Sequence, residues 1–92
     1  MQPGNNISDA AIYRLLLFVA GNEPNSLKAK EIVFRICRKY LHGNYEIKVV
    51  DVYEDYQSAI NHQVIIVPTL IIESPPPLKI VAGSINDEKK LL

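Results

Sequence analysis

The sequence predicts a small α/β protein with a single domain, built on a strand–helix–strand unit in its first half. Three observations lead to this prediction: an apolar run at 13–20, a helical period at 26–41 and a second strand pattern at 46–52. A chain of 92 residues has room for one core. Two strands joined by a long helix pair in parallel, with a right-handed crossover.

The first strand is expected to be buried on both faces. Residues 13–20 are almost continuously apolar and are bounded by Gly21-Asn22 and Pro24, a pattern typical of a strand inside a parallel sheet. Residues 1–10 are rich in Asn, Pro, Gly and Ser and predict a disordered tail. The folded domain is therefore expected at 11–92.

The helix at 26–41 has one apolar stripe and two terminal signals. Asn25 or Ser26 is expected to cap its start, and Gly43 is expected to end it in the left-handed conformation. The stripe recurs at helical spacing and comprises Ala29, Val33, Ile36, Cys37, Tyr40 and Leu41. The following strand, 46–52, is rich in β-branched residues, as strands are.

The opposite face of this helix is predicted to be cationic. Its candidate partner-binding residues are Lys28, Lys30, Glu31, Arg35 and Arg38, with Lys39 beside them. On a chain with ten basic and ten acidic residues, such a local excess suits docking to an oppositely charged protein. The alternative is an ordinary solvated helix face. The acidic residues Asp51, Glu54 and Asp55 are expected to form a solvated loop.

The second half is less determined by local pattern. A weak helix is expected near 56–62, while 64–67, 70–72 and 78–82 are apolar runs that fit either strands or buried helices. A proline at the position of Pro68, before an edge strand, is often cis. Ser84 with Asp87 resembles a capping box and predicts a final helix.

Composition excludes several classes of function. Zero net charge gives no drive for nucleic-acid binding, and no apolar run is long enough to span a membrane, so a cytoplasmic protein is expected. Neither a metal nor a cofactor is expected, because Cys37 reads as a core residue and the two His lack partners at ligand spacing. Low repulsion and apolar edges at 70–72 and 78–81 predict self-association.

Four segments carry a resemblance to a known family. LFVAGNEPNS (17–26), KVVDV (48–52), VPTL (67–70) and SPPPLKIVAGS (74–84) resemble the KaiB circadian-clock family. The resemblance runs from about residue 13 to 92. The motif and structural positions that it singles out are Ala20, Gly21, Asn22, Pro24, Asn25, Ser26, Asp51, Pro68, Thr69, Pro76, Pro77 and Gly83.

The resemblance implies a thioredoxin-like relationship and a role without catalysis or cofactor. Members bind the ATPase KaiC, help to capture KaiA and displace the kinase SasA, and form homodimers or homotetramers. They can also be metamorphic. The first strand–helix–strand unit is constant, while the second half adopts either the KaiB ground-state arrangement or the thioredoxin-like βαβαββα arrangement.

Three alternatives remain beside this reading. Clock members commonly have two basic residues after the proline run, whereas this chain has only Lys79 followed by Ile80, which favours a KaiB-like stress-adaptation protein outside an oscillator. The second alternative is the sensory domain of a SasA-type kinase. The third is a thiol oxidoreductase using Cys37, which is disfavoured because no cysteine lies at 21–24.

Overall fold

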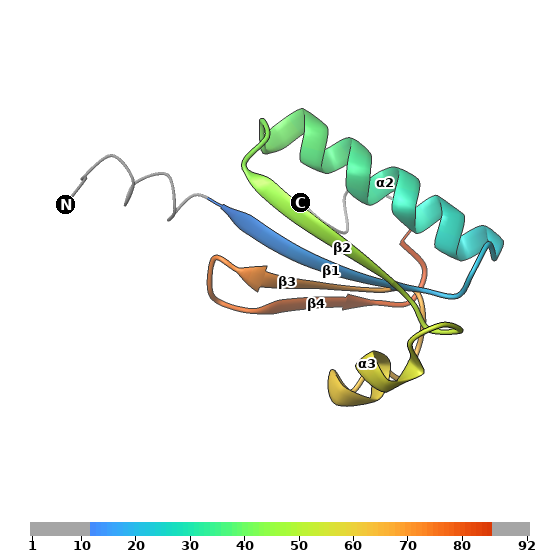
Figure 1. Cartoon of the computed structure of the whole chain (residues 1–92). Coiled ribbons are helices and arrows are strands. Elements are labelled where there is room, and N and C mark those ends of the chain that lie inside the picture. The colour runs from blue at the N-terminus through green and yellow to red at the C-terminus, as the bar shows by residue number, and fades with distance from the viewer. Residues whose placement is uncertain (1–11, 86–92) are drawn as a thin grey trace.

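The computed structural model describes residues 12–85, which form a mixed sheet with a helix on each face (Figure 1). The element order is β1 (Tyr13–Val19), α2 (Pro24–Tyr40), β2 (Tyr45–Asp51), α3 (Tyr56–Asn61), β3 (Thr69–Ser74) and β4 (Lys79–Ala82). The strands lie in the order β2-β1-β3-β4. Of the two arrangements expected for the second half, this is the thioredoxin-like one.

β1 lies inside the sheet, as its apolar run predicts. It pairs in parallel with β2, Tyr13 opposite Tyr45, and antiparallel with β3, Leu17 opposite Leu70. Residues 15–19 are all buried. The strand–helix–strand prediction is thus confirmed, with each strand ending one residue earlier than expected.

The start of α2 differs from the expectation. Glu23 occupies the N-cap position without a side-chain hydrogen bond, and Pro24 takes the first helical position, where its fixed φ and missing N–H suit a helix start. Ser26 lies within the helix, and its Oγ accepts a hydrogen bond from the Ala20 N–H at 2.9 Å. The prediction of Asn25 or Ser26 as the cap is therefore wrong.

The end of α2 follows the expected chemistry with one change. The helix stops at Tyr40, and both His42 (φ 50°) and Gly43 (φ 86°) adopt the left-handed conformation. Glycine adopts it without steric cost. Most of the apolar stripe is buried, but Tyr40 is 43% exposed, and Ile32 joins the core in addition.

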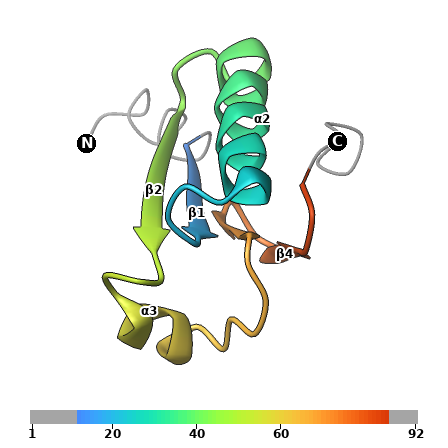
Figure 2. The same cartoon turned by 90° about the vertical axis from the view of Figure 1, so that its right-hand side faces the viewer.

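Alternation along the strands divides the core into two layers. Leu15, Leu17 and Val19 point towards α2, while Leu16 and Phe18 point to the other face. α2 covers the first layer over most of its length, whereas the short α3 covers only one end of the second (Figure 2). The second layer is consequently smaller and more exposed.

The second half contains the largest departures from the local pattern. α3 is confirmed at Tyr56–Asn61, and the carboxylate of Asp55 accepts a hydrogen bond from the Ser58 N–H at 3.1 Å. Residues 64–67 are not a strand but a connection to the cis Val67–Pro68 peptide. The strand after Pro68 is internal, between β1 and β4, so the prediction of an edge strand there is wrong.

The proline run forms the turn between β3 and β4. Pro76 and Pro77 are exposed, and β4 begins only at Lys79, leaving Leu78 in the turn. The expected tail at 1–10 and the expected helix after Ser84 lie outside the described residues. The last described residue, Ile85, is buried in the layer beneath α2.

Candidate partner-binding surface

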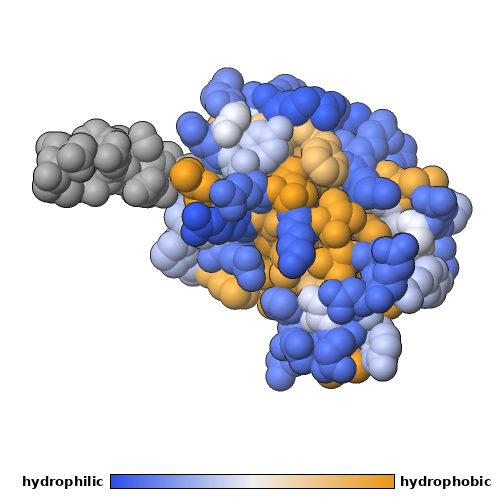
Figure 3. Space-filling model, in the orientation of Figure 1, coloured by the Kyte–Doolittle hydropathy of each residue, from blue (hydrophilic) through white to orange (hydrophobic). Residues whose placement is uncertain are grey.

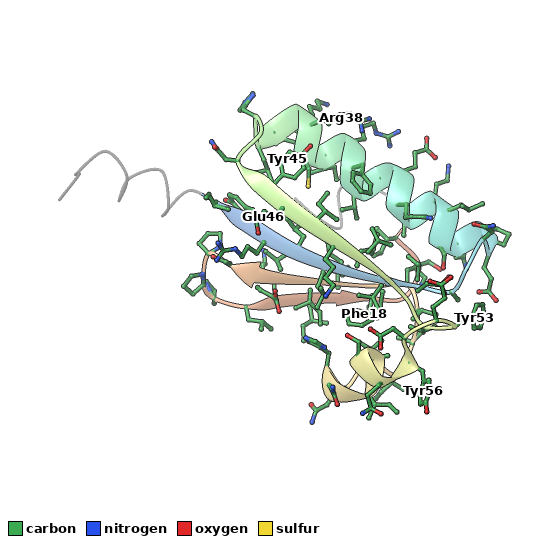
Figure 4. The ribbon with its side chains drawn as sticks, in the orientation of Figure 1. Phe18, Arg38, Tyr45, Glu46, Tyr53 and Tyr56 are labelled. Atoms are coloured by element: carbon green, nitrogen blue, oxygen red, sulfur yellow. The ribbon has the colours of Figure 1, made fainter. Side chains whose placement is uncertain are left out.

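The outer face of α2 carries most of the charged residues expected to bind a partner. Lys28, Glu31, Arg35 and Arg38 are exposed, and Figure 4 places Arg38 on the side of α2 away from the sheet. Glu31 lies 4.0 Å from the Lys28 Nζ and 3.5 Å from an Arg35 guanidinium nitrogen. Exposed pairs of this kind contribute little to stability. This face is therefore a predominantly cationic surface in contact with solvent.

Lys30 lies outside this cationic face. At about 100° per residue, it stands roughly 140° around the helix axis from Arg35, and it is only half-exposed. Its neighbour one turn further on is the half-buried Phe34. The helix geometry therefore separates Lys30 from the face that carries Lys28, Glu31, Arg35 and Arg38.

The β1–α2 turn is held to the end of β2 by hydrogen bonds from backbone N–H groups to the Asp51 carboxylate. The Gly21 N–H donates to Asp51 Oδ1 at 3.1 Å, and the Tyr53 N–H donates to the same oxygen at 3.0 Å. Gly21 has φ 51°, and a Cβ there would meet the Tyr53 ring at 3.2 Å. The left-handed backbone favours glycine at this position, and a Cβ would also have to displace the Tyr53 ring by a few tenths of an ångström.

Tyr53 is a residue of this end of the sheet that sequence reasoning missed. It is 69% exposed, its hydroxyl donates to Glu23 Oε2 at 3.3 Å, and Figure 4 shows it beside the start of α2. The Glu23 charge and this hydrogen bond raise the pKa of Tyr53. The available signal was its place two residues after Asp51, at the end of the strand.

The remaining motif residues have structural roles or are exposed. The Thr69 hydroxyl donates to the Ile66 carbonyl, and the Gly83 N–H donates to the Pro68 carbonyl at 2.9 Å. Asn22 and Asn25 are exposed beside the β1–α2 turn. Most of the sequence motif therefore specifies turns and strand connections, while Asn22 and Asn25 add polar surface.

The acidic residues near the end of β2 hold backbone groups or face solvent. Asp51 and Asp55 both accept hydrogen bonds from backbone N–H groups, and Glu54 and Asp55 are exposed. Within residues 12–85, no group of three or more His, Cys, Asp and Glu is arranged to hold a metal ion.

Cys37 is buried and lines an apolar pocket. The pocket has a volume of about 200 Å³ and lies between α2 and the sheet, with Cys37 beside Tyr13, Leu15 and Ile72. Burial raises the pKa of the thiol to about 11. The thiol therefore keeps its proton at neutral pH, which removes the thiolate that disulfide exchange needs.

The fold has close counterparts among solved thioredoxin-like structures. The thioredoxin Deadhead of Drosophila melanogaster has a TM-score of 0.71 at 22% identity, covering 96% of this chain and 81% of the other. The N-terminal domain of SasA from Synechococcus elongatus has a TM-score of 0.68 at 20% identity, covering 78% and 69%. The chain is thus a small thioredoxin-like α/β domain that displays a charged helix face.

Within this class the chain belongs to the KaiB family. The KaiB domain model matches residues 16–92. The circadian clock oscillator protein KaiB1 of Synechocystis sp. is 38% identical over 80 residues, which cover 87% of this chain and 76% of that protein. The circadian clock protein KaiB3 of the same organism is 35% identical over 78 residues, covering 85% and 76%. A clock-type role follows from this membership.

Proposed function

We propose that this chain is a non-catalytic, cytoplasmic clock regulator that binds a KaiC-like ATPase. The contact surface is the outer face of α2 together with the neighbouring strand β2. The observation that carries the proposal is the cationic α2 face on a chain whose net charge is zero. A neutral protein with one charged face associates in a defined orientation with a partner of opposite charge.

The surface beside α2 also offers apolar area for such a contact. Figure 3 shows an apolar region between α2 and α3, rimmed by hydrophilic residues. On β2, Val49 is 38% exposed, and Ile47 is half-buried. An apolar centre within a polar rim is the usual composition of a protein interface. Together the two features support docking of a protein rather than of a small ligand.

The proposal includes fold switching of the second half. α3 buries only Ala59, and β4 has no fully buried residue. Ile60, Ile65 and Ile80 are each more than half exposed. A segment with so few buried contacts contributes little stability, so a second packing of the same residues can lie within a few kcal/mol. The thioredoxin-like arrangement is the one proposed to bind the ATPase.

KaiA-like and SasA-like proteins are further proposed partners. The fold shared with the SasA N-terminal domain supports competition between the two domains for one site on the ATPase. The same likeness favours a second candidate function, the sensory domain of a SasA-type kinase. A stress-adaptation role outside an oscillator would use the same ATPase contact and would differ in the response that the binding controls. A kinase domain encoded in the same reading frame would favour the sensory-domain candidate over a separate clock regulator.

The test is direct binding of the full chain to a purified KaiC-like ATPase from the same genome, measured at several salt concentrations. We expect binding whose affinity falls as salt rises, because exposed charges are screened. Absence of binding at low salt contradicts the proposal. An insulin-reduction assay tests the redox alternative. Reductase activity in the wild type that is lost in Cys37→Ser would contradict our proposal and identify the chain as a thiol oxidoreductase.

A further inference from the structure

Two exposed tyrosines follow the end of β2. Tyr53 is 69% exposed and Tyr56 is 66% exposed, and Figure 4 shows both near the end of the sheet where β2 leads into α3. Tyrosine is among the side chains that supply most of the binding energy at protein interfaces. The function proposed above uses the outer face of α2 and leaves these two rings without a role.

The side chain of Tyr53 is held in place although it is exposed. Its ring packs on the backbone of Gly21, since a Cβ there would stand 3.2 Å from a ring carbon. Its hydroxyl donates to Glu23 Oε2 at 3.3 Å, and its backbone N–H donates to Asp51 Oδ1 at 3.0 Å. A side chain that is already ordered loses little conformational freedom when a partner binds. Tyr53 therefore presents a preorganised aromatic surface to solvent.

The charge around these rings is negative. Residues 49–78 contain four carboxylates and neither lysine nor arginine. Glu23 and Glu54 are both exposed; the first accepts the Tyr53 hydroxyl bond, and the second follows Tyr53 in the chain. The Glu23 charge and hydrogen bond, with a further contribution from Asp51, raise the pKa of Tyr53. The field that disfavours a phenolate here attracts a cation, so this surface is complementary to a positively charged partner.

We infer that Tyr53 and Tyr56 form a docking surface for a basic segment of a partner protein, in which an arginine or lysine side chain lies on the Tyr53 ring. A cation is attracted by the negative face of an aromatic ring, and an arginine also stacks flat on it. Glu23 and Glu54 then form ion pairs with neighbouring basic side chains of the segment. This tyrosine surface is separate from the cationic face of α2, and the inference does not depend on ATPase binding.

The shape of the tyrosine surface favours a protein segment over a small ligand or an ion. Small ligands are usually enclosed in a concave pocket, whereas both rings are about two-thirds exposed. Within the described part of the chain, 12–85, no His, Cys, Asp and Glu residues converge in a group that could hold a metal ion. A segment with several basic side chains can contact the ring and the separate carboxylates at the same time.

NMR titration of the isotope-labelled full chain with hexa-arginine at low salt tests this surface. We expect the amide signals of residues 21–25 and 51–56 to shift and to saturate, with an affinity that falls as salt rises. Hexa-citrulline has a similar shape without the charge, and it should cause no shifts at the same concentrations. The spectrum of each free variant described below checks that its fold is retained.

Two pairs of variants separate the ring from the charge. Tyr53→Ala should weaken peptide binding about fivefold, whereas Tyr53→Phe keeps the ring and should stay within about twofold of the wild type. Glu23→Gln should weaken binding about threefold. Its matched control is Glu73→Gln, which makes the same change at an exposed carboxylate on β3 and should bind as the wild type does.

Three results would each overturn the inference: no shifts at low salt, equal shifts with hexa-citrulline, or wild-type affinity in Tyr53→Ala. Shifts of residues 21–25 and 51–56 that grow with protein concentration before any peptide is added would assign the surface to the cationic α2 face of a second copy, and would also overturn it. The titration contains no ATPase, so failure of the chain to bind an ATPase would count only against the proposed function.

Discussion

At the scale of single residues, the carboxylate of Asp51 links three segments of the chain. It lies at the end of β2 and accepts hydrogen bonds from Gly21 in the β1–α2 turn and from Tyr53 after the strand. A hydrogen bond to a charged acceptor contributes more than one between neutral groups. The turn and the end of the sheet are therefore held by one side chain.

Replacing this carboxylate should destabilise the fold. Asp51→Ala leaves the part-buried Gly21 N–H without its acceptor, and we expect the free energy of unfolding to fall by about 1–2 kcal/mol. Urea denaturation measures the change. Glu54→Ala removes an exposed carboxylate nearby and should stay within about 0.5 kcal/mol of the wild type. Equal stability of both variants would contradict the role assigned to Asp51.

Cys37 should make stability depend on alkaline pH. Its thiol pKa is raised from 9.0 to about 11 by burial. Between these values the unfolded chain has released the proton and the folded chain has not, so stability is complete below pH 9 and falls as the pH rises. The loss should approach about 1.4 kcal/mol per pH unit.

The measurement compares urea unfolding of the wild type and of Cys37→Ala from neutral pH to about pH 11. Subtracting the two curves removes the tyrosine and lysine titrations that both proteins share. We expect the wild type to lose stability relative to Cys37→Ala as pH rises. A difference that stays constant across this range would show that the thiol titrates at its ordinary pKa in the folded protein.

At the scale of elements, the outer face of α2 should contribute to binding and little to folding. The double variant Lys28→Glu with Arg35→Glu reverses two exposed charges and breaks both ion pairs of Glu31. Exposed pairs contribute at most about 1 kcal/mol to stability, whereas opposed like charges at an interface cost several kcal/mol. We expect ATPase affinity at low salt to fall at least about tenfold while the fold is retained.

The matched control is Lys79→Glu, compared with Lys28→Glu alone. Each variant reverses one exposed charge, and Lys79 lies on β4, outside the proposed contact. We expect Lys79→Glu to bind the ATPase nearly as the wild type does. If Lys79→Glu and Lys28→Glu lose affinity equally, the effect comes from net charge and not from α2. Unchanged affinity in the helix variant would remove α2 from the interface.

Some helices and strands could be predicted from local sequence and others could not. The helix and both flanking strands were predictable because apolar spacing reports which face each element buries. The prediction that Lys30 shares the cationic face of α2 grouped the basic residues by their closeness in sequence. It took no account of the angle at which each side chain leaves the helix axis. Pro24 bounds the preceding apolar run in the sequence, but the first helical position also favours proline, so α2 begins at Pro24, earlier than the expected cap at Asn25 or Ser26.

At the scale of the whole molecule, the two halves should differ in their conformational equilibria. We expect NMR spectra of a dilute sample, with and without the ATPase, to contain a second set of peaks for residues 56–92 only. Residues 13–51 are held by paired strands and by the layer beneath α2, and they should keep one set. A single set under both conditions, with unchanged secondary shifts, would mean that this chain does not switch.

The sequence by itself determined the parallel strand–helix–strand unit, the buried stripe of α2 and the core position of Cys37, because these depend on periodicity within one element. The tertiary structure decided that β3 is internal and β4 an edge, that 64–67 is a connection, and that Asp51 and Tyr53 meet the β1–α2 turn. Those features depend on pairing between residues far apart in the chain. A short apolar run has the same local preference at either position, so only its hydrogen-bonded neighbours distinguish a central strand from an exposed one.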